Sequence, residues 1–161
     1  MKAGKNSGIF EWEYHITELF DSYINEMEIP PTKIVMNWGA WNSDKVLTST
    51  IEKWMTAAAK TVNRKGEVSV YWTRTTPHVK EIREKSRWFK PSDQAASKYC
   101  GDNPSICKYI DFPDSLFASY KNSDYLDSMH FKVAKGYEKW SEEIYRNMAS
   151  SNQQESLDYS S

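Results

Sequence analysis

Apolar residues recur at helical spacing in three long segments of the chain. This spacing places them on one face of a helix, so we predict helices over Trp12–Met27, Asp44–Val62 and Val133–Met148. The first helix should stop at Ile29-Pro-Pro31, because proline cannot continue the helical hydrogen-bond ladder. The second should end near Gly66, a residue that suits a left-handed cap.

Short apolar runs between these helices predict strands. Lys33–Asn37 and Val68–Trp72 are the clearest, and Tyr109–Phe112 is a third candidate. The stretch His78–Lys108 is polar, and we expect it to be irregular. Strands that alternate with helices favour a parallel sheet with right-handed crossovers, so the predicted class is α/β.

The length of 161 residues fits one domain. We expect that domain to occupy residues 1–148, and the polar residues 149–161 to form a disordered tail. In a parallel sheet the functional loops lie beyond the carboxyl ends of the strands. Three segments should therefore gather at that edge, namely Trp38–Ser43, Thr73–His78 and the segment leading to His130.

The sharpest candidate for chemistry is the pair Asp127 and His130. A carboxylate at this spacing can hold one imidazole nitrogen while the other deprotonates a serine hydroxyl. The alternative is an aspartate that caps the following helix beside an exposed histidine, and from the spacing alone this alternative is favoured.

A second candidate is Asn37-Trp-Gly-Ala-Trp-Asn42, directly after the first predicted strand. Gly39 allows close backbone approach, and an asparagine amide at a strand end can donate to a developing oxyanion. The alternative, which the local sequence favours, is a turn in which Asn42 or Ser43 caps the next helix.

Other polar residues leave both functional and structural interpretations open. Arg74 could bind an anionic group, or it could be a surface residue or part of an ion pair. His78 follows Pro77 in a loop that should face the site, whereas His15 lies inside the first predicted helix and is more simply structural.

The composition of the chain limits the classes of binding partner that we expect. The net charge of -1 gives no electrostatic reason to expect nucleic acid or an acidic membrane, and no apolar run approaches a membrane span. Met1–Gly8 is polar and has no apolar core, so we expect no signal peptide in this segment. Aromatic residues make up 14% of the chain, and such a surplus often lines a pocket for sugars or flat ligands. Trp38, Trp41 and Trp72 lie where a substrate could stack.

Cys100 and Cys107 flank a loop-like segment. A local disulfide between them would imply a secretory compartment, and two free thiols fit the sequence equally well. We do not expect a zinc site, because no matching Cys or His pair lies nearby.

Taken together, these motifs resemble the SGNH (GDSL-like) hydrolase superfamily. Its members carry a Ser in a first block, a Gly in a second, an Asn in a third and an Asp-x-x-His before the C-terminal helix. Asp127-Ser-Met-His130 resembles the last block, Gly39-Ala-Trp-Asn42 the third, and Gly8 the second. The segment Tyr71–Pro77 is similar to a later strand of the family that often ends in Thr-Pro.

The resemblance implies a flavodoxin-like, three-layer α/β/α fold with a parallel sheet. It also implies a serine ester hydrolase or an O-acyltransferase, with His130 as the base and Asp127 orienting it. Asn42 would hold the oxyanion, assisted by a backbone N–H of Gly39 or Gly8. The aromatic residues favour acetylated carbohydrate as the substrate, and no metal or organic cofactor is implied.

Two features depart from the family pattern. Two residues rather than one separate Gly39 and Asn42, so Asn37 competes for the oxyanion role. No Gly-Asp-Ser occurs in the chain, so we expect the nucleophile segment to lie upstream of Met1. The alternative is a non-catalytic α/β module that binds a glycan or a partner protein.

Overall fold

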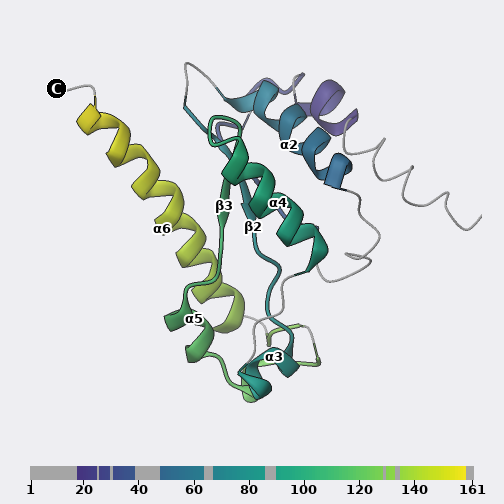
Figure 1. Ribbon diagram of the computed structural model, residues 1–161, viewed down its shortest axis with the longest axis vertical. Coiled ribbons are helices and arrows are strands. Elements are labelled where there is room, and N and C mark those ends of the chain that lie inside the picture. The colour runs from purple at the N-terminus through teal and green to yellow at the C-terminus, as the bar shows by residue number, and fades with distance from the viewer. Residues whose placement is uncertain are drawn as a thin grey trace, which may run out of the picture. The chain divides into compact units, whose positions relative to one another are not determined.

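The chain forms two compact units in a computed structural model (Figure 1). The first unit comprises Met1–Thr75 and Phe89–Tyr109, and the second comprises Thr76–Trp88 and Ile110–Ser161. From the sequence we expected a single domain over residues 1–148, and that expectation stays a prediction. The structure describes residues 18–24, 26–29, 31–38, 48–63, 67–85, 90–128, 130–132 and 135–158.

A three-stranded parallel sheet organises the first unit, in the order β1-β2-β3. The α/β class predicted from the sequence is therefore confirmed. The strands β1 and β2 coincide with the two clearest predicted strands, and β3 reaches the boundary between the units. The strands are β1 (Ile34–Met36), β2 (Val70–Thr73) and β3 (Lys108–Ile110), and the helices of this unit are η1 (Leu19–Ile24), α2 (Thr48–Val62) and α4 (Pro91–Asp102).

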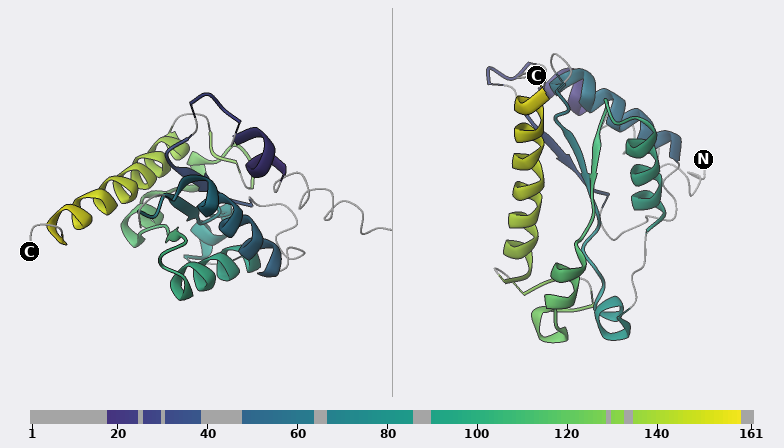
Figure 2. Two further views of the ribbon diagram at one scale, coloured as in Figure 1. Left: turned by 90° about the horizontal axis from the view of Figure 1, so that it is seen from above. Right: turned by 60° about the vertical axis from the view of Figure 1, so that its left-hand side comes forward.

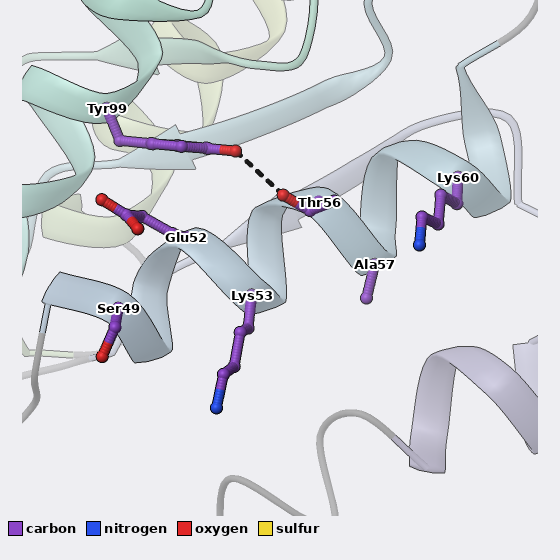
Figure 3. A pocket seen from close by; sticks show the side chains of 7 residues that line it. All are labelled: Ser49, Glu52, Lys53, Thr56, Ala57, Lys60 and Tyr99. Atoms are coloured by element: carbon purple, nitrogen blue, oxygen red, sulfur yellow. Dashed lines mark hydrogen bonds between the residues drawn. The ribbon is translucent and has the colours of Figure 1, made fainter.

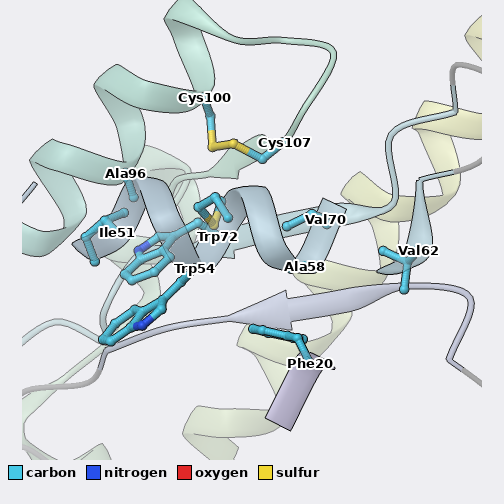
Figure 4. Packing of buried hydrophobic residues seen from close by; sticks show 11 residues of the cluster. Phe20, Ile51, Trp54, Ala58, Val62, Val70, Trp72, Ala96, Cys100 and Cys107 are labelled. Carbon is cyan, nitrogen blue, oxygen red and sulfur yellow. A yellow bond between two sulfur atoms is a disulfide. The ribbon is translucent and has the colours of Figure 1, made fainter. Parts of the chain in front are cut away.

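The core of this unit lies between one face of the sheet and the helices α2 and α4 (Figure 4). In the parallel register Met36 pairs with Trp72, and since side chains alternate along a strand, Val70 and Trp72 share the face that meets the helices. The buried cluster consists of Phe20, Ile51, Trp54, Met55, Ala58, Val62, Val70, Trp72, Ala96, Cys100 and Cys107.

The helix α2 buries the apolar face that the sequence predicted, with Ile51, Trp54 and Ala58 almost fully inaccessible to solvent. The first predicted helix is described only from residue 18 onward, where η1 is a π-helix whose Phe20 packs into the core. Val35 of β1 is 44% exposed, so the predicted burial of the first strand is only partly right. It lies on the opposite face of the sheet from the core, and β1 is an edge strand.

The prediction of an irregular stretch over His78–Lys108 is wrong, because it contains α3 (Val79–Glu84) and α4. Pro91 occupies the first turn of α4, where its missing N–H costs nothing. The residues that α4 buries are Ser92, Asp93, Ala96 and Cys100. They are small or polar, so the helix carries no apolar stripe that a sequence pattern could detect.

A disulfide between Cys100 and Cys107 joins the end of α4 to the segment entering β3 (Figure 4). Both residues belong to the buried cluster, at 3% and 1% exposure. The sequence left open a disulfide or two free thiols, and the structure contains the disulfide.

The second unit contains α3, α5 (Asp114–Ser119), the 3-10 helix η2 (Asn122–Asp124) and α6 (Lys135–Asp158). Figure 2 shows α6 as one long helix near the C-terminus. It extends beyond Met148, where the sequence placed its end. Aromatic rings form the core of this unit, with Phe112 stacked on Trp140 at 3.8 Å and Tyr120 stacked on Phe131 at 4.7 Å between ring centroids.

Among the helices that the structure describes, none has both the length and the apolar character needed to cross a membrane.

Replacing both Cys100 and Cys107 with alanine should destabilise the protein by about 2 to 3 kcal/mol, because the short loop is no longer restricted in the unfolded chain. Thermal unfolding with and without dithiothreitol measures this. The reductant should lower the melting temperature of the wild type and leave that of the double variant unchanged. Equal melting temperatures for the oxidised wild type and the variant would contradict the prediction.

Candidate functional site

Asp127 and His130 are in direct contact. The Nδ1 atom of His130 lies 2.7 Å from Oδ2 of Asp127, and the backbone N–H of His130 donates to Oδ1 at 2.9 Å. The two side chains are 51% and 50% exposed, respectively. Since α6 begins only at Lys135, the aspartate holds the histidine rather than capping that helix.

This contact fixes the tautomer of the neutral imidazole. A carboxylate can only accept, so Nδ1 carries the hydrogen and Nε2 carries the lone pair. No residue in the described part of the chain hydrogen-bonds Nε2 of His130. The half-exposed ring can therefore accept a proton from a hydroxyl group that approaches from solvent.

The segment Leu126–His130, which we term the Asp–His loop, is closed at its base. The flanking residues Tyr125 and Phe131 form an isolated antiparallel β-bridge, and the N–H of Leu126 donates to the carbonyl of His130 at 2.7 Å. The rings of Tyr125 and Phe131 are buried, with centroids 4.5 Å apart. Backbone pairing and aromatic packing thus hold the loop that presents the pair.

The segment after β2 makes a second attachment to this loop. The N–H of Val79 donates to the carbonyl of Ser128 at 2.9 Å, and the hydroxyl of Tyr125 donates to the carbonyl of Pro77 at 2.7 Å. Burial raises the pKa of Tyr125 above its ordinary value of 10.0, so the phenol stays protonated and can donate. The expected meeting of the loop after the second strand with the segment leading to His130 is confirmed.

His78 is the N-cap of α3. Its Nδ1 accepts from the N–H of Lys80 at 3.0 Å, and its own N–H donates to Oε1 of Glu81 at 3.0 Å. The carboxylate of Glu81 is almost fully buried. This reciprocal capping fixes both the start of α3 and the orientation of the His78 ring.

In the first unit the ends of β1 and β2 are tied by Asn37. Its Nδ2 donates to the carbonyl of Thr73 at 2.7 Å and to Oγ1 of Thr75 at 3.3 Å. The two strand ends therefore meet, as expected for parallel strands. Both amide hydrogens of Asn37 are engaged in these bonds, which makes it a link between strands rather than a ready oxyanion donor.

Asp93 lies beneath these strand ends and is fully buried. Its Oδ1 accepts from Nε1 of Trp72 at 3.1 Å, and its Oδ2 accepts from the N–H of Thr75 at 3.0 Å. Burial raises the pKa of Asp93, against the opposing effect of these hydrogen bonds and of the Arg74 charge. Sequence analysis did not identify this residue, because it lies in the stretch that we expected to be irregular.

The predicted substrate-binding tryptophans occupy different environments. Trp72 is 1% exposed and packs in the core, so no ligand can stack on its ring in this conformation. Trp38 is half-buried and stacks on Trp54 with a centroid distance of 4.9 Å. Trp41, and the predicted oxyanion residues Gly8, Gly39 and Asn42, lie outside the described residues.

A pocket of about 500 Å³ opens on the outer face of α2 and contains none of the predicted site residues (Figure 3). Thr56 and Tyr99 are joined across it by a 2.8 Å hydrogen bond between their hydroxyl groups. Lys53 and Lys60 extend from the same side of α2 in this view. The lining residues are Ser49, Glu52, Lys53, Thr56, Ala57, Lys60 and Tyr99.

Within the described ranges, no group of three His, Cys, Asp or Glu side chains is arranged to hold a metal ion. Comparisons with protein-family models, curated proteins and solved structures give no match to this chain. The interpretation of the site therefore depends on its own geometry and chemistry.

Asp93→Asn should change how stability depends on pH. The raised pKa means that the folded state binds the proton of Asp93 more tightly than the unfolded chain, whose value is near 3.8. In the wild type this carboxyl group therefore lowers the free energy of unfolding as the pH rises above about 3.8. The variant should lack that decrease. Urea unfolding at a series of pH values measures it, and parallel pH profiles for the two proteins would contradict it.

Gly136→Ala should destabilise the protein by about 1 to 3 kcal/mol through overpacking. A Cβ at Gly136 would overlap the buried ring of Phe131, which closes the Asp–His loop. Gly101→Ala is the matched control, since a Cβ there meets nothing within 4 Å and the residue lies in α4. The free energy of unfolding of the control should increase by about 0.5 to 1 kcal/mol, because alanine is more favourable than glycine in a helix. Chemical denaturation of both variants tests the contrast, and similar shifts in both would contradict it.

Proposed function

We propose that this chain carries the acid–base half of a serine ester hydrolase or an O-acyltransferase. The supporting observation is the contact between Asp127 and His130, which leaves Nε2 of a half-exposed imidazole available as a base. The resemblance of Asp127-Ser-Met-His130 to the last block of the SGNH superfamily adds to this. The flavodoxin-like, three-layer fold of that superfamily is part of the same proposal.

In the proposed reaction Nε2 of His130 accepts a proton from a serine hydroxyl as its oxygen bonds to the carbonyl carbon of an ester. Asp127 stabilises the imidazolium that forms. The imidazolium then returns the proton to the alcohol oxygen as the ester bond breaks, which leaves an acyl group on the serine. Water releases that group in a hydrolase, and a second alcohol accepts it in a transferase, by the same steps in reverse.

The serine itself is not assigned, because no Gly-Asp-Ser occurs in the sequence. Acetylated carbohydrate is the proposed substrate class, supported by the abundance of aromatic residues. Trp72 does not support it, since its ring is buried.

A non-catalytic binding module is the second candidate. The observation that favours it is the pocket on α2, which lies in the first unit and whose lining includes hydroxyl groups and lysines. Such a surface could bind a glycan or a partner protein without any reaction at His130.

His130→Ala should lower kcat/KM for aryl acetate esters on the order of 1,000-fold, because the proton acceptor is lost. Asp127→Asn should also lower kcat/KM. A carboxylate only accepts hydrogen bonds and so keeps the proton of the neutral imidazole on Nδ1, whereas an amide, which can also donate, does not. The measurement is the release of the phenol by the purified protein, in a form that also carries the nucleophilic serine that this proposal requires.

Ser128→Ala is the matched control, because this exposed side chain lies in the same loop and makes no hydrogen bond to the described residues, whereas the bond to Val79 uses the backbone carbonyl. It should retain wild-type activity. Hydrolysis that survives His130→Ala unchanged, or a wild type without any hydrolysis, would contradict the proposal and favour the binding module.

A further inference from the structure

A second histidine lies in the segment that is attached to the Asp–His loop. His78 immediately precedes Val79, whose N–H is bonded to the carbonyl of Ser128 at 2.9 Å. It immediately follows Pro77, whose carbonyl accepts from the hydroxyl of Tyr125 at 2.7 Å. His78 thus lies between one hydrogen bond to the Asp–His loop and one to Tyr125 at the base of that loop, and all of these residues belong to the second unit.

The two imidazoles have opposite tautomers in their neutral forms. Nδ1 of His78 accepts the N–H of Lys80, so its proton must be on Nε2. Nδ1 of His130 faces a carboxylate, so its proton is on Nδ1. His78 therefore offers an Nε2–H donor, whereas His130 offers an Nε2 acceptor. Among the described residues, none accepts a hydrogen bond from Nε2 of His78.

We propose that His78 contacts the substrate as a hydrogen-bond donor, through Nε2–H, to the carbonyl oxygen of the ester on which His130 acts. This inference rests on the proposed function of Asp127 and His130. It assigns a donor that is distinct from the residues predicted from the sequence for the oxyanion.

The proposed role follows from the charge that develops during acyl transfer. As the serine oxygen bonds to the carbonyl carbon, the C=O electron pair moves onto the carbonyl oxygen, while His130 takes the hydroxyl proton. A neutral imidazole N–H stabilises that oxyanion by a hydrogen bond without giving up its proton. When the C=O bond reforms and the alcohol leaves, the same N–H returns to a weaker bond with the neutral carbonyl.

The local structure makes this donor rigid. The reciprocal capping with Lys80 and Glu81 fixes both the backbone and the ring of His78, and the residue is half-buried. A donor whose orientation is set before the substrate binds needs little reorganisation in the transition state. A histidine is not needed for capping alone, because asparagine, aspartate and serine are the preferred N-cap residues.

Asparagine is a preferred N-cap residue, so the variant His78→Asn can test the proposal. His78→Asn should keep the cap, since its Oδ1 can accept the N–H of Lys80 in place of Nδ1, but it removes the imidazole donor. We expect an unchanged melting temperature and a fall in kcat for aryl acetate hydrolysis of about 100-fold, with a smaller change in KM. His78→Ala should lose both the activity and the cap, and its melting temperature should fall below that of His78→Asn.

A double-variant cycle with His130 separates a shared site from a general effect on the fold. If both histidines act in one step, adding His78→Asn to His130→Ala should cost far less activity than His78→Asn alone. Wild-type kcat in His78→Asn, together with the loss of activity in His130→Ala, would overturn this inference and leave the proposed function standing. Activity that depends on neither histidine would overturn both, and additive losses in the cycle would overturn the shared site.

Discussion

Buried backbone polar groups must be hydrogen-bonded, and this requirement shapes the chain around the end of β2. Three groups there are bonded by side chains from distant parts of the sequence. Asn37 donates to the carbonyl of Thr73, Asp93 accepts from the N–H of Thr75, and Tyr125 donates to the carbonyl of Pro77. A buried group left without its partner typically costs about 1 to 3 kcal/mol, so each bond restricts the path of this segment strongly. The segment leads directly into α3 and its histidine cap.

The same kind of buried hydrogen bond also restrains the Asp–His loop. Tyr125 both donates to Pro77 and pairs with Phe131, so one buried residue joins the segment after β2 to the base of the loop. The loop itself remains accessible, with Asp127 and His130 about half exposed. A buried base and an exposed tip are suited to a residue that must keep its orientation while it meets a ligand from solvent.

The helix α4 shows where pattern analysis fails. Its buried side is formed by small and polar residues, because Ala96 and Cys100 pack closely against α2 while Asp93 is needed to bond Trp72 and Thr75. Burial of a carboxylate is favourable only when donors surround it, and those donors come from another element. Trp72 was assigned to a substrate surface for a related reason: its position at the strand end is visible in the sequence, but the direction of its ring is not.

The sequence by itself determined the α/β class, the strands β1 and β2 and the apolar face of α2. These features depend on periodicity, so local spacing is sufficient to find them. For Asp127 and His130 the spacing alone favoured a helix cap, and their contact is seen only in the structure. Only the tertiary structure decided the helices α3 and α4, the burial of Trp72 and Asp93, the disulfide and the attachment of His78 to the Asp–His loop. Each of these depends on hydrogen bonds or packing between elements, and the energy of such contacts is set by which segments meet rather than by the local sequence.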